Sequence, residues 1–305
     1  MKTIGFFACS NGYGHYKRIS EIATLLSNDF DITIYASKLQ INKLGLVNNC
    51  KHVELALDNV RWDKIMSESK LFFEEYLKGI EIHKDSFLKH DYVISDNLVG
   101  LLKFRPDTIL IGSFFWKDVL KDKFGPNKFT DYDSSLLQKY CPPLITNKYA
   151  ETGDVVLYKN KIQFGFGCKD IPYKEFKIDR LLTLSPSLNY LDSYTNFFDK
   201  LKLKTTLNFE QTKNIVIMCR PGLGIITHCV EHHIPLIALY DNRDSIEIIK
   251  LAKKVEYLNI GFHQNVNSDF NEVKYSLFKD NSIYRYNHFE KDGYLKIAGY
   301  LKSKL

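Results

Sequence analysis

One short segment combines two glycines, a histidine and two basic side chains, Cys9-Ser10-Asn11-Gly12-Tyr13-Gly14-His15-Tyr16-Lys17-Arg18. An apolar stretch before it predicts a strand, and an amphipathic stretch from about His15 predicts a helix. Gly12 and Gly14 permit positive φ angles and a close approach of the backbone to a ligand. The first N–H groups of a helix have no partner within the helix and attract anionic or hydroxylic groups. The segment therefore predicts a ligand-binding turn.

The titratable group of this turn is the imidazole of His15, a side-chain type that serves as acid or base near neutral pH. A single histidine at a helix end is more often structural or solvated, so its role depends on a second segment that indicates the same kind of site. The glycine spacing does not match G-x-G-x-x-G, because position 17 is Lys, and it does not match the P-loop. Neither a dinucleotide site nor a P-loop is supported.

A second turn of this kind lies later in the chain, at Cys219-Arg220-Pro221-Gly222-Leu223-Gly224. It also follows an apolar strand, Ile215 to Met218, and precedes a predicted helix. Gly222 and Gly224 permit a tight turn, and the helix N-terminus offers N–H donors and the positive dipole end to a phosphate. Arg220 supplies a charge-assisted contact. Two such turns in one chain indicate two ligand-binding surfaces.

The composition limits the class of protein. The 305 residues are 45% hydrophobic, enough for two packed domains, and the formal charge is +6. Lysines are spread along the chain, which favours small anionic ligands over nucleic acid. The six cysteines form no C-x-x-C pair, so we expect reduced thiols. With neither a signal peptide nor a long apolar run, we expect a cytoplasmic protein, and contact with the inner face of a membrane stays open as an alternative.

Short apolar runs alternate with helical patterns, as in parallel α/β sheets. We expect two domains, residues 1–170 and a smaller one at 180–305, joined near 167–179. A strand is expected at Val155 to Tyr158. An apolar stripe from Tyr294 to Leu305 predicts a terminal helix that packs on a domain, and it is counted with the second domain.

Both turns resemble motifs of the GT-B nucleotide-sugar enzymes, which include MurG-like N-acetylglucosaminyltransferases and hydrolases of activated sugars. The first is similar to G-x-G-H-x-x-R. The second is similar to R-P-G-x-G-T-x-[ST]-[DE], followed by a G-x-P strand start at His233-Ile234-Pro235-Leu236. Val93-Ile94-Ser95-Asp96 and Gly112-Ser113-Phe114-Phe115-Trp116 resemble the VISD and NFxW stretches of a GT-B branch related to the amino-terminal part of L-arabinose kinases.

The resemblance implies an α/β fold with two Rossmann-like domains facing across a cleft and a carboxyl-terminal helix packing back. The acceptor is expected at the first domain and the nucleotide sugar at the second. His15 becomes the leading catalytic residue, and Asp96 orients it or acts as the base itself, with helix capping as the structural alternative. The acceptor-side turn comprises Asn11, Gly12, Gly14 and Arg18. The donor-binding set comprises Ser185, Arg220, Gly222, Leu223, Gly224, Ile225, Thr227, His228, Asp244 and Glu247.

The second turn departs from the family pattern at two positions. Ile225 stands where the family has the Thr that contacts the donor diphosphate, and His228 stands where it has the acid that contacts the ribose. Thr227 offers a hydroxyl and Glu231 a carboxylate nearby. Asp244 and Glu247 lie where the family holds the donor sugar's hydroxyls, although a solvated helix start has the same acidic bias.

The resemblance therefore implies a glycosyltransferase that moves a sugar from a nucleotide-diphosphate sugar, UDP-sugar first, to a hydroxyl acceptor on a glycan, a lipid-linked molecule or a small molecule. Inversion by direct displacement is expected. Helix dipoles and basic residues serve the diphosphate, so no metal or other cofactor is expected. Two alternatives stay open, namely a nucleotide-sugar hydrolase with the same His-bearing turn and a non-catalytic nucleotide-sugar-binding protein. A nucleic-acid acceptor is disfavoured, because no stripe of aromatic and basic residues is present.

Overall fold

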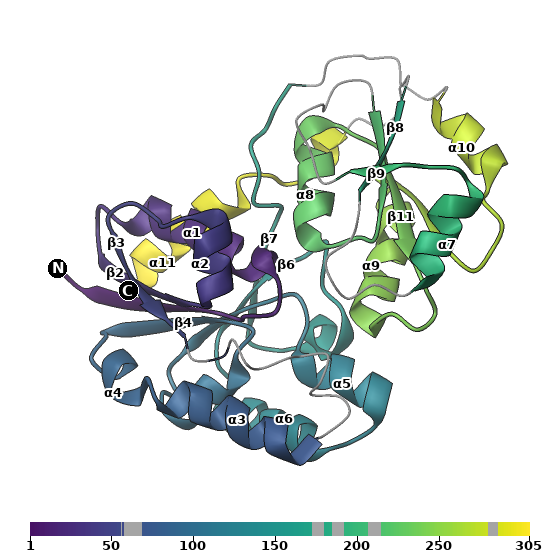
Figure 1. Ribbon diagram of the computed structural model, residues 1–305. Helices are drawn as coiled ribbons and strands as arrows, with labels where there is room; N and C mark the ends of the chain where they lie inside the picture. The colour runs from purple at the N-terminus through teal and green to yellow at the C-terminus, as the bar shows by residue number, and fades with distance from the viewer. Residues whose placement is uncertain (56, 58–68, 173–179, 185–191, 207–214, 280–285) are drawn as a thin grey trace. The chain divides into compact units, whose positions relative to one another are not determined.

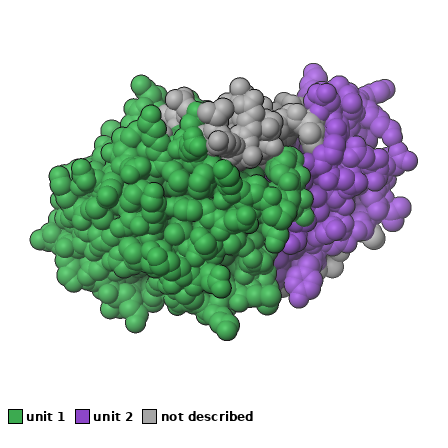
Figure 2. Space-filling model, turned by 90° about the horizontal axis from the view of Figure 1, so that it is seen from below, with its two compact units in different colours: residues 1–164, 293–305 green, residues 165–292 purple. Residues whose placement is uncertain are grey.

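The chain forms two compact α/β units in a computed structural model (Figure 1). It describes residues 1–55, 57, 69–172, 180–184, 192–206, 215–279 and 286–305. Unit 1 comprises residues 1–164 together with 293–305, and unit 2 comprises residues 165–292 (Figure 2). The first unit thus ends earlier than the expected boundary at residue 170.

Unit 1 is built on a seven-stranded sheet in which every neighbouring pair is parallel. The strand order is β3-β2-β1-β4-β5-β6-β7, the Rossmann order with an added edge strand. The strands are β1 (Thr3–Ala8), β2 (Asp31–Ala36), β3 (Cys50–Glu54), β4 (Tyr92–Asp96), β5 (Ile109–Ile111), β6 (Leu144–Asn147) and β7 (Lys161–Phe164).

Helices cover both faces of this sheet, because successive strand residues point to opposite faces and both are apolar. Ile109 and Ile111 belong to one buried cluster, whereas Leu110 between them belongs to another. The helical segments of unit 1 are α1 (Tyr13–Leu26), α2 (Lys38–Leu44), α3 (Ser69–Glu81), α4 (Lys84–Phe87), η1 (Val99–Lys103), α5 (Trp116–Phe124), α6 (Lys128–Tyr140), η2 (Gly153–Leu157) and α11 (Gly293–Lys304).

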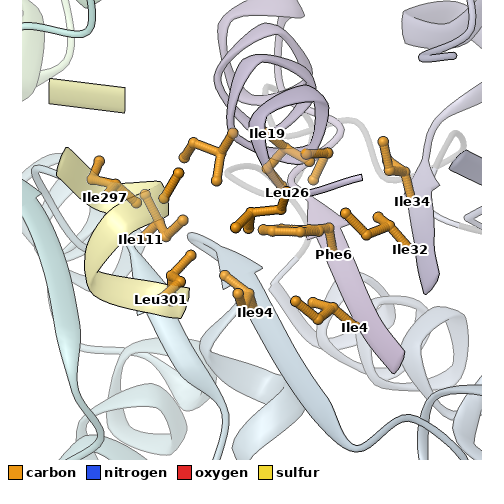
Figure 3. Packing of buried hydrophobic residues seen from close by; sticks show 14 of the residues in the cluster. Ile4, Phe6, Ile19, Leu26, Ile32, Ile34, Ile94, Ile111, Ile297 and Leu301 are labelled. Atoms are coloured by element: carbon orange, nitrogen blue, oxygen red, sulfur yellow. The ribbon is translucent and has the colours of Figure 1, made fainter. Parts of the chain in front are cut away.

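The terminal helix α11 belongs to unit 1, although we had counted it with the second domain. Its apolar stripe packs beside α1. Figure 3 shows Ile297 and Leu301 of α11 next to Ile19 and Leu26 of α1, over the strand residues of the same cluster. The stripe predicted a packed helix, but the partner surface comes from the other end of the chain.

Unit 2 has a smaller parallel sheet with the strand order β12-β11-β10-β8-β9. Its strands are β8 (Arg180–Leu184), β9 (Thr205–Thr206), β10 (Ile215–Cys219), β11 (Leu236–Tyr240) and β12 (Gly261–Asn265). Its helical segments are α7 (Asp192–Lys200), α8 (Leu223–His232), α9 (Ile246–Tyr257), α10 (Glu272–Lys279) and η3 (Tyr286–His288). One buried cluster joins α7 to the apolar residues of β10 and β11.

Both strand orders place a glycine turn where the order reverses. In unit 1 the chain passes from β1 to β2 on one side, and β4 lies on the other side of β1. In unit 2, β8 lies on one side of β10, and β11 and β12 follow on the other side of β10. Ligands of open α/β sheets bind at such points, beyond the carboxyl ends of the strands. Each turn therefore occupies the position at which its sheet is suited to bind a ligand.

The predicted strand at Val155 to Tyr158 is wrong, because Gly153–Leu157 forms the 3-10 helix η2. Its apolar residues read as a short strand, yet only Val155 is buried. Within the described residues, no helix is long and apolar enough to cross a membrane.

Candidate functional site

The first glycine turn connects β1 to α1. Gly12 is the N-cap residue and has φ 85°, in the region that favours glycine, whereas Gly14 lies inside the helix with an ordinary φ. Only one of the two glycines thus has the expected positive φ. The helix begins at Tyr13, two residues earlier than expected, and it has no side-chain cap and no acidic residue in its first turn. Its first N–H groups lack the usual side-chain acceptor.

Gln40 holds this turn in place from a neighbouring helix. Its buried side-chain amide donates to the carbonyl oxygens of Cys9 (2.8 Å) and Gly12 (2.6 Å). Its carbonyl oxygen accepts from the N–H of Ser37, which completes the capping box of α2. Sequence reasoning missed this residue. The S-x-x-Q spacing at positions 37–40 was the available signal, although it predicts the cap and not the contact with the turn.

The turn brings His15 to the end of β4. Because Ala8 pairs with Asp96 in the sheet, the helix that follows β1 starts beside this carboxylate. His15 Nδ1 lies 2.7 Å from Asp96 Oδ1. Arg18, one helical turn after His15, donates from Nε to Oδ2 (2.6 Å) and from Nη2 to Oδ1 (2.7 Å). Three residues singled out from the sequence thus form one connected group.

Asp96 is fully buried, and burial by itself raises the pKa of a carboxyl group. The charge of Arg18 and the hydrogen bonds from His15 and Arg18 act in the opposite direction, and the pKa of Asp96 lies below its ordinary value. An ionised carboxylate only accepts hydrogen bonds, so the proton of the neutral imidazole is on Nδ1. Nε2 then carries a lone pair, and no described residue hydrogen-bonds to it.

An aromatic wall lies beside the imidazole. The rings of His15 and Trp116 have centroids 6.5 Å apart, and Phe114 packs edge-on against Trp116 at 5.0 Å. Both aromatic side chains are largely buried. Of the other turn residues, Asn11 is half-buried and Lys17 is exposed. The imidazole therefore lies between a charged group and an apolar surface.

The second glycine turn connects β10 to α8. Helix α8, like α1, begins without a side-chain cap. Gly222 is the N-cap residue with an extended φ of −135°, and Gly224 lies in the helix, so neither has a positive φ. A Cβ atom added to either glycine would meet no described atom within 4 Å. The protein's own packing therefore does not require glycine at these positions. The same is true of Gly12 and Gly14.

Helices α4, α5 and α9 also begin without a side-chain cap, but each has an acidic residue in its first turn. Helices α2 and α6 both begin with a complete capping box, in which a side chain accepts from the helix backbone. Helix α8, like α1, has no side-chain cap and no acidic residue in its first turn. Helix N-termini with available N–H groups bind anions. Both glycine turns thus present such a terminus, and no described atom lies within 4 Å of a Cβ added to their glycines.

Arg220 and Asp244 form an ion pair beside the second turn, with Arg220 Nε 2.9 Å from Asp244 Oδ1. The other carboxylate oxygen accepts from the hydroxyl of Tyr194 and from the N–H of Asp241 at 2.8 Å. Asp244 is thus enclosed by protein donors and holds Arg220 at the carboxyl end of β10. Tyr194, in α7, was not foreseen, and nothing in its local sequence indicated this contact.

The other predicted donor-side residues lie close by in the chain. Leu223 and Ile225 are in the first turn of α8, and Thr227 and His228 follow in the next turn, all half-buried. Glu247 is half-buried in the first turn of α9. Ser185 lies outside the described residues. Glu231, the alternative carboxylate, accepts from the backbone N–H of Lys169 at 3.2 Å.

No group of three or more His, Cys, Asp or Glu side chains that could hold a metal ion occurs in the described part of the chain. Asp131 and Asp133 have Asp-x-Asp spacing, but they lie in α6, where residues two apart point in different directions. Asp131 is exposed and Asp133 is buried. Burial raises the pKa of Asp133 well above its ordinary value.

Comparison with known proteins gives matches among solved structures only. No family model and no curated protein sequence matches this chain. The glycotransferase of kitacinnamycin superposes with a TM-score of 0.68 at 12% identity and covers 100% of this chain and 99% of its own. Acinetobacter baumannii MurG superposes with a TM-score of 0.63 at 11% identity and covers 99% and 100%.

LpCGTa, whose structure is a complex with UDP, superposes with a TM-score of 0.63 at 10% identity and covers 100% of this chain and 94% of its own. These likenesses extend over the full length of the chain, through both sheets and both glycine turns. At such low identity they are evidence of architecture. The protein has the GT-B fold.

Proposed function

We propose that this protein is a glycosyltransferase that moves a sugar from a nucleotide-diphosphate sugar to a hydroxyl acceptor. The observation that carries the proposal is the contact of His15 Nδ1 with the buried Asp96 carboxylate, 2.7 Å, which leaves Nε2 as the basic atom. In the proposed reaction, Nε2 takes the proton of the acceptor hydroxyl while its oxygen attacks the anomeric carbon. The bond from that carbon to the diphosphate breaks, and direct displacement inverts the anomeric configuration.

We assign the diphosphate to the start of α8. Its N–H groups and dipole meet negative charge, and Gly222 and Gly224 let the phosphates approach the backbone. Arg220, held by Asp244, adds a positive charge. These groups stabilise the leaving diphosphate in the proposal without a metal ion. The UDP complex of the structurally similar LpCGTa makes UDP-sugars the first donors to test.

The test begins with a thermal-shift screen of the purified protein against UDP, GDP, CMP, dTDP and their sugars. Nucleotide release is then measured with and without candidate acceptors, using the parent protein and His15→Ala. Loss of a general base is expected to lower turnover by about 10²- to 10⁴-fold while nucleotide binding persists. His288→Gln, which changes an exposed histidine in unit 2, is the control and is expected to keep the parent's turnover.

Each result decides between the candidate functions. His15-dependent release that requires an acceptor supports the transferase. Release without an acceptor would make the protein a nucleotide-sugar hydrolase, and binding without turnover would make it a nucleotide-sugar-binding protein. Ile225 and His228, which replace the residues of the family pattern, favour that last reading. If no nucleotide or nucleotide sugar stabilises the protein, the proposed function is rejected.

A further inference from the structure

Arg18 holds the Asp96 carboxylate by both oxygens. Its Nε and Nη2 atoms lie 2.6 and 2.7 Å from Oδ2 and Oδ1, the two-point geometry that a guanidinium forms with a carboxylate. Only 14% of the Arg18 side chain is exposed, and none of the Asp96 side chain is. Nη2 also lies 3.4 Å from His15 Nδ1. The guanidinium therefore contacts both members of the His15–Asp96 pair.

The charges of this group depend on the state of His15. With a neutral imidazole, one cationic side chain, Arg18, contacts the Asp96 carboxylate. With an imidazolium, two cationic side chains contact this one carboxylate. Like charges at this distance repel, and more strongly for largely buried groups. Without Arg18 the charged form of His15 would be favoured, because only an imidazolium would then neutralise Asp96.

We infer that Arg18 is a positioning residue that keeps His15 a neutral base. It compensates the charge of Asp96, and it fixes the plane of the carboxylate so that Oδ1 meets Nδ1–H. The charge compensation follows from the geometry alone, whereas its catalytic consequence rests on the proposed function. Pairing with an uncompensated buried carboxylate favours the imidazolium form of a histidine near neutral pH. An imidazolium has no lone pair on Nε2 with which to accept a proton.

Among the described residues, the other groups around His15 do not replace this compensation. Cys9, at the end of β1, is buried, and burial raises the pKa of its thiol to about 12, so it stays uncharged. Trp116 on α5 has no charge. Its neighbour Lys117 is paired with Asp118, at 2.6 Å, and with Asp154. Lys17 on α1 is exposed, where water screens its charge.

The test is a titration of the His15 ring signals by NMR on the ligand-free full-length protein, with the signals assigned from His15→Ala. Arg18→Gln is compared with Lys17→Gln, which also removes one positive charge from α1 but does not touch Asp96. Arg18→Gln is expected to move the His15 titration about one pH unit or more toward higher pH. Lys17→Gln is expected to move it by no more than a few tenths of a unit.

Two further variants keep the test decisive if Arg18→Gln does not fold. Asp96→Asn removes the anion and leaves the cation, so the His15 titration is expected at lower pH than in the parent. Arg18→Lys keeps the charge without the two-point contact. The His15 titration in Arg18→Lys is expected near that in the parent, while nucleotide release falls by about tenfold or more.

The inference is overturned if the His15 signals titrate at the same pH in Arg18→Gln, Lys17→Gln and the parent. It is also overturned if Asp96→Asn moves the His15 titration to higher pH or does not move it. None of these titrations uses a substrate. A parent protein that binds and releases no nucleotide would reject the proposed function, and the titrations would still decide the role of Arg18.

Discussion

The fully buried carboxylate of Asp96 accepts hydrogen bonds from His15 and Arg18. Removing one partner of a buried ionic group leaves the other partner uncompensated. Asp96→Asn is expected to lower the free energy of unfolding at neutral pH by about 3 to 5 kcal/mol, since Arg18 then loses the Asp96 carboxylate. Urea denaturation measures this change.

The same variant tests the pH dependence of stability. The pKa of Asp96 is lowered in the folded protein, so its contribution is complete above the ordinary carboxyl value of about 4 and is lost as the pH falls through the lower folded value. The stability gap between parent and Asp96→Asn is therefore expected to narrow below about pH 4. Asp107→Asn, at an exposed carboxylate, is the control and is expected to stay within about 0.5 kcal/mol of the parent. A gap that is constant with pH would contradict the assignment.

At the scale of elements, the uncapped starts of α1 and α8 set a specific expectation for their glycines. Gly14→Ala and Gly224→Ala add a methyl group that meets no described protein atom. Alanine is the better helix former, so stability is expected to stay equal or to rise by up to about 1 kcal/mol. Nucleotide affinity is expected to fall about tenfold or more for Gly224→Ala, because the methyl group occupies the space assigned to the diphosphate.

Gly299→Ala is the matched control, because Gly299 also lies in a helix, α11, with no described atom within 4 Å of an added Cβ. It is expected to change stability in the same direction and to leave nucleotide affinity unchanged. Calorimetric titration with the nucleotide found in the screen measures affinity. Equal affinity in Gly224→Ala and the parent would show that the diphosphate does not approach this turn.

Helix α2 positions the first turn through one side chain. Gln40→Ala would leave the carbonyl oxygens of Cys9 and Gly12 without their donor, at an expected cost of about 1 to 3 kcal/mol. It is also expected to lower turnover, since the turn that carries His15 loses its anchor. Thr130→Val, which breaks the capping box of α6, should cost stability without a comparable loss of turnover. Equal losses of turnover in both variants would argue against a specific role of Gln40.

At the scale of the whole molecule, both ends of the chain contribute to unit 1. Leu301 of α11 is fully buried against the cluster that includes α1. Leu301→Ala is expected to destabilise unit 1 by about 2 to 5 kcal/mol. Both tryptophans of the sequence, Trp62 and Trp116, fall within residues 1–164, so tryptophan fluorescence reports on unit 1.

Leu251→Ala is the control, because Leu251 is buried in α9 of unit 2. The tryptophan transition is expected to move to lower denaturant concentration in Leu301→Ala and to stay in place in Leu251→Ala. A transition that moved equally in both variants would show that the two units unfold as one.

The sequence by itself determined the local features of this protein. Alternating apolar runs and helical stripes predicted the parallel α/β architecture, and the two strand–glycine–helix turns were found, because periodicity and turn chemistry depend on neighbouring residues. Short segments such as η2 were predicted wrongly, because a few apolar residues fit a strand or a helix turn equally well.

Only the tertiary structure decided which distant residues meet. The family resemblance suggested that Asp96 orients His15, but their contact spans 81 positions and depends on the pairing of β1 with β4, which no local pattern encodes. The same holds for the enclosure of Asp244 by Arg220 and Tyr194. The assignment of α11 to unit 1 likewise depends on packing between the two ends of the chain. Strand order and long-range packing arise from the cooperative burial of whole faces, and they convert separate motifs into sites.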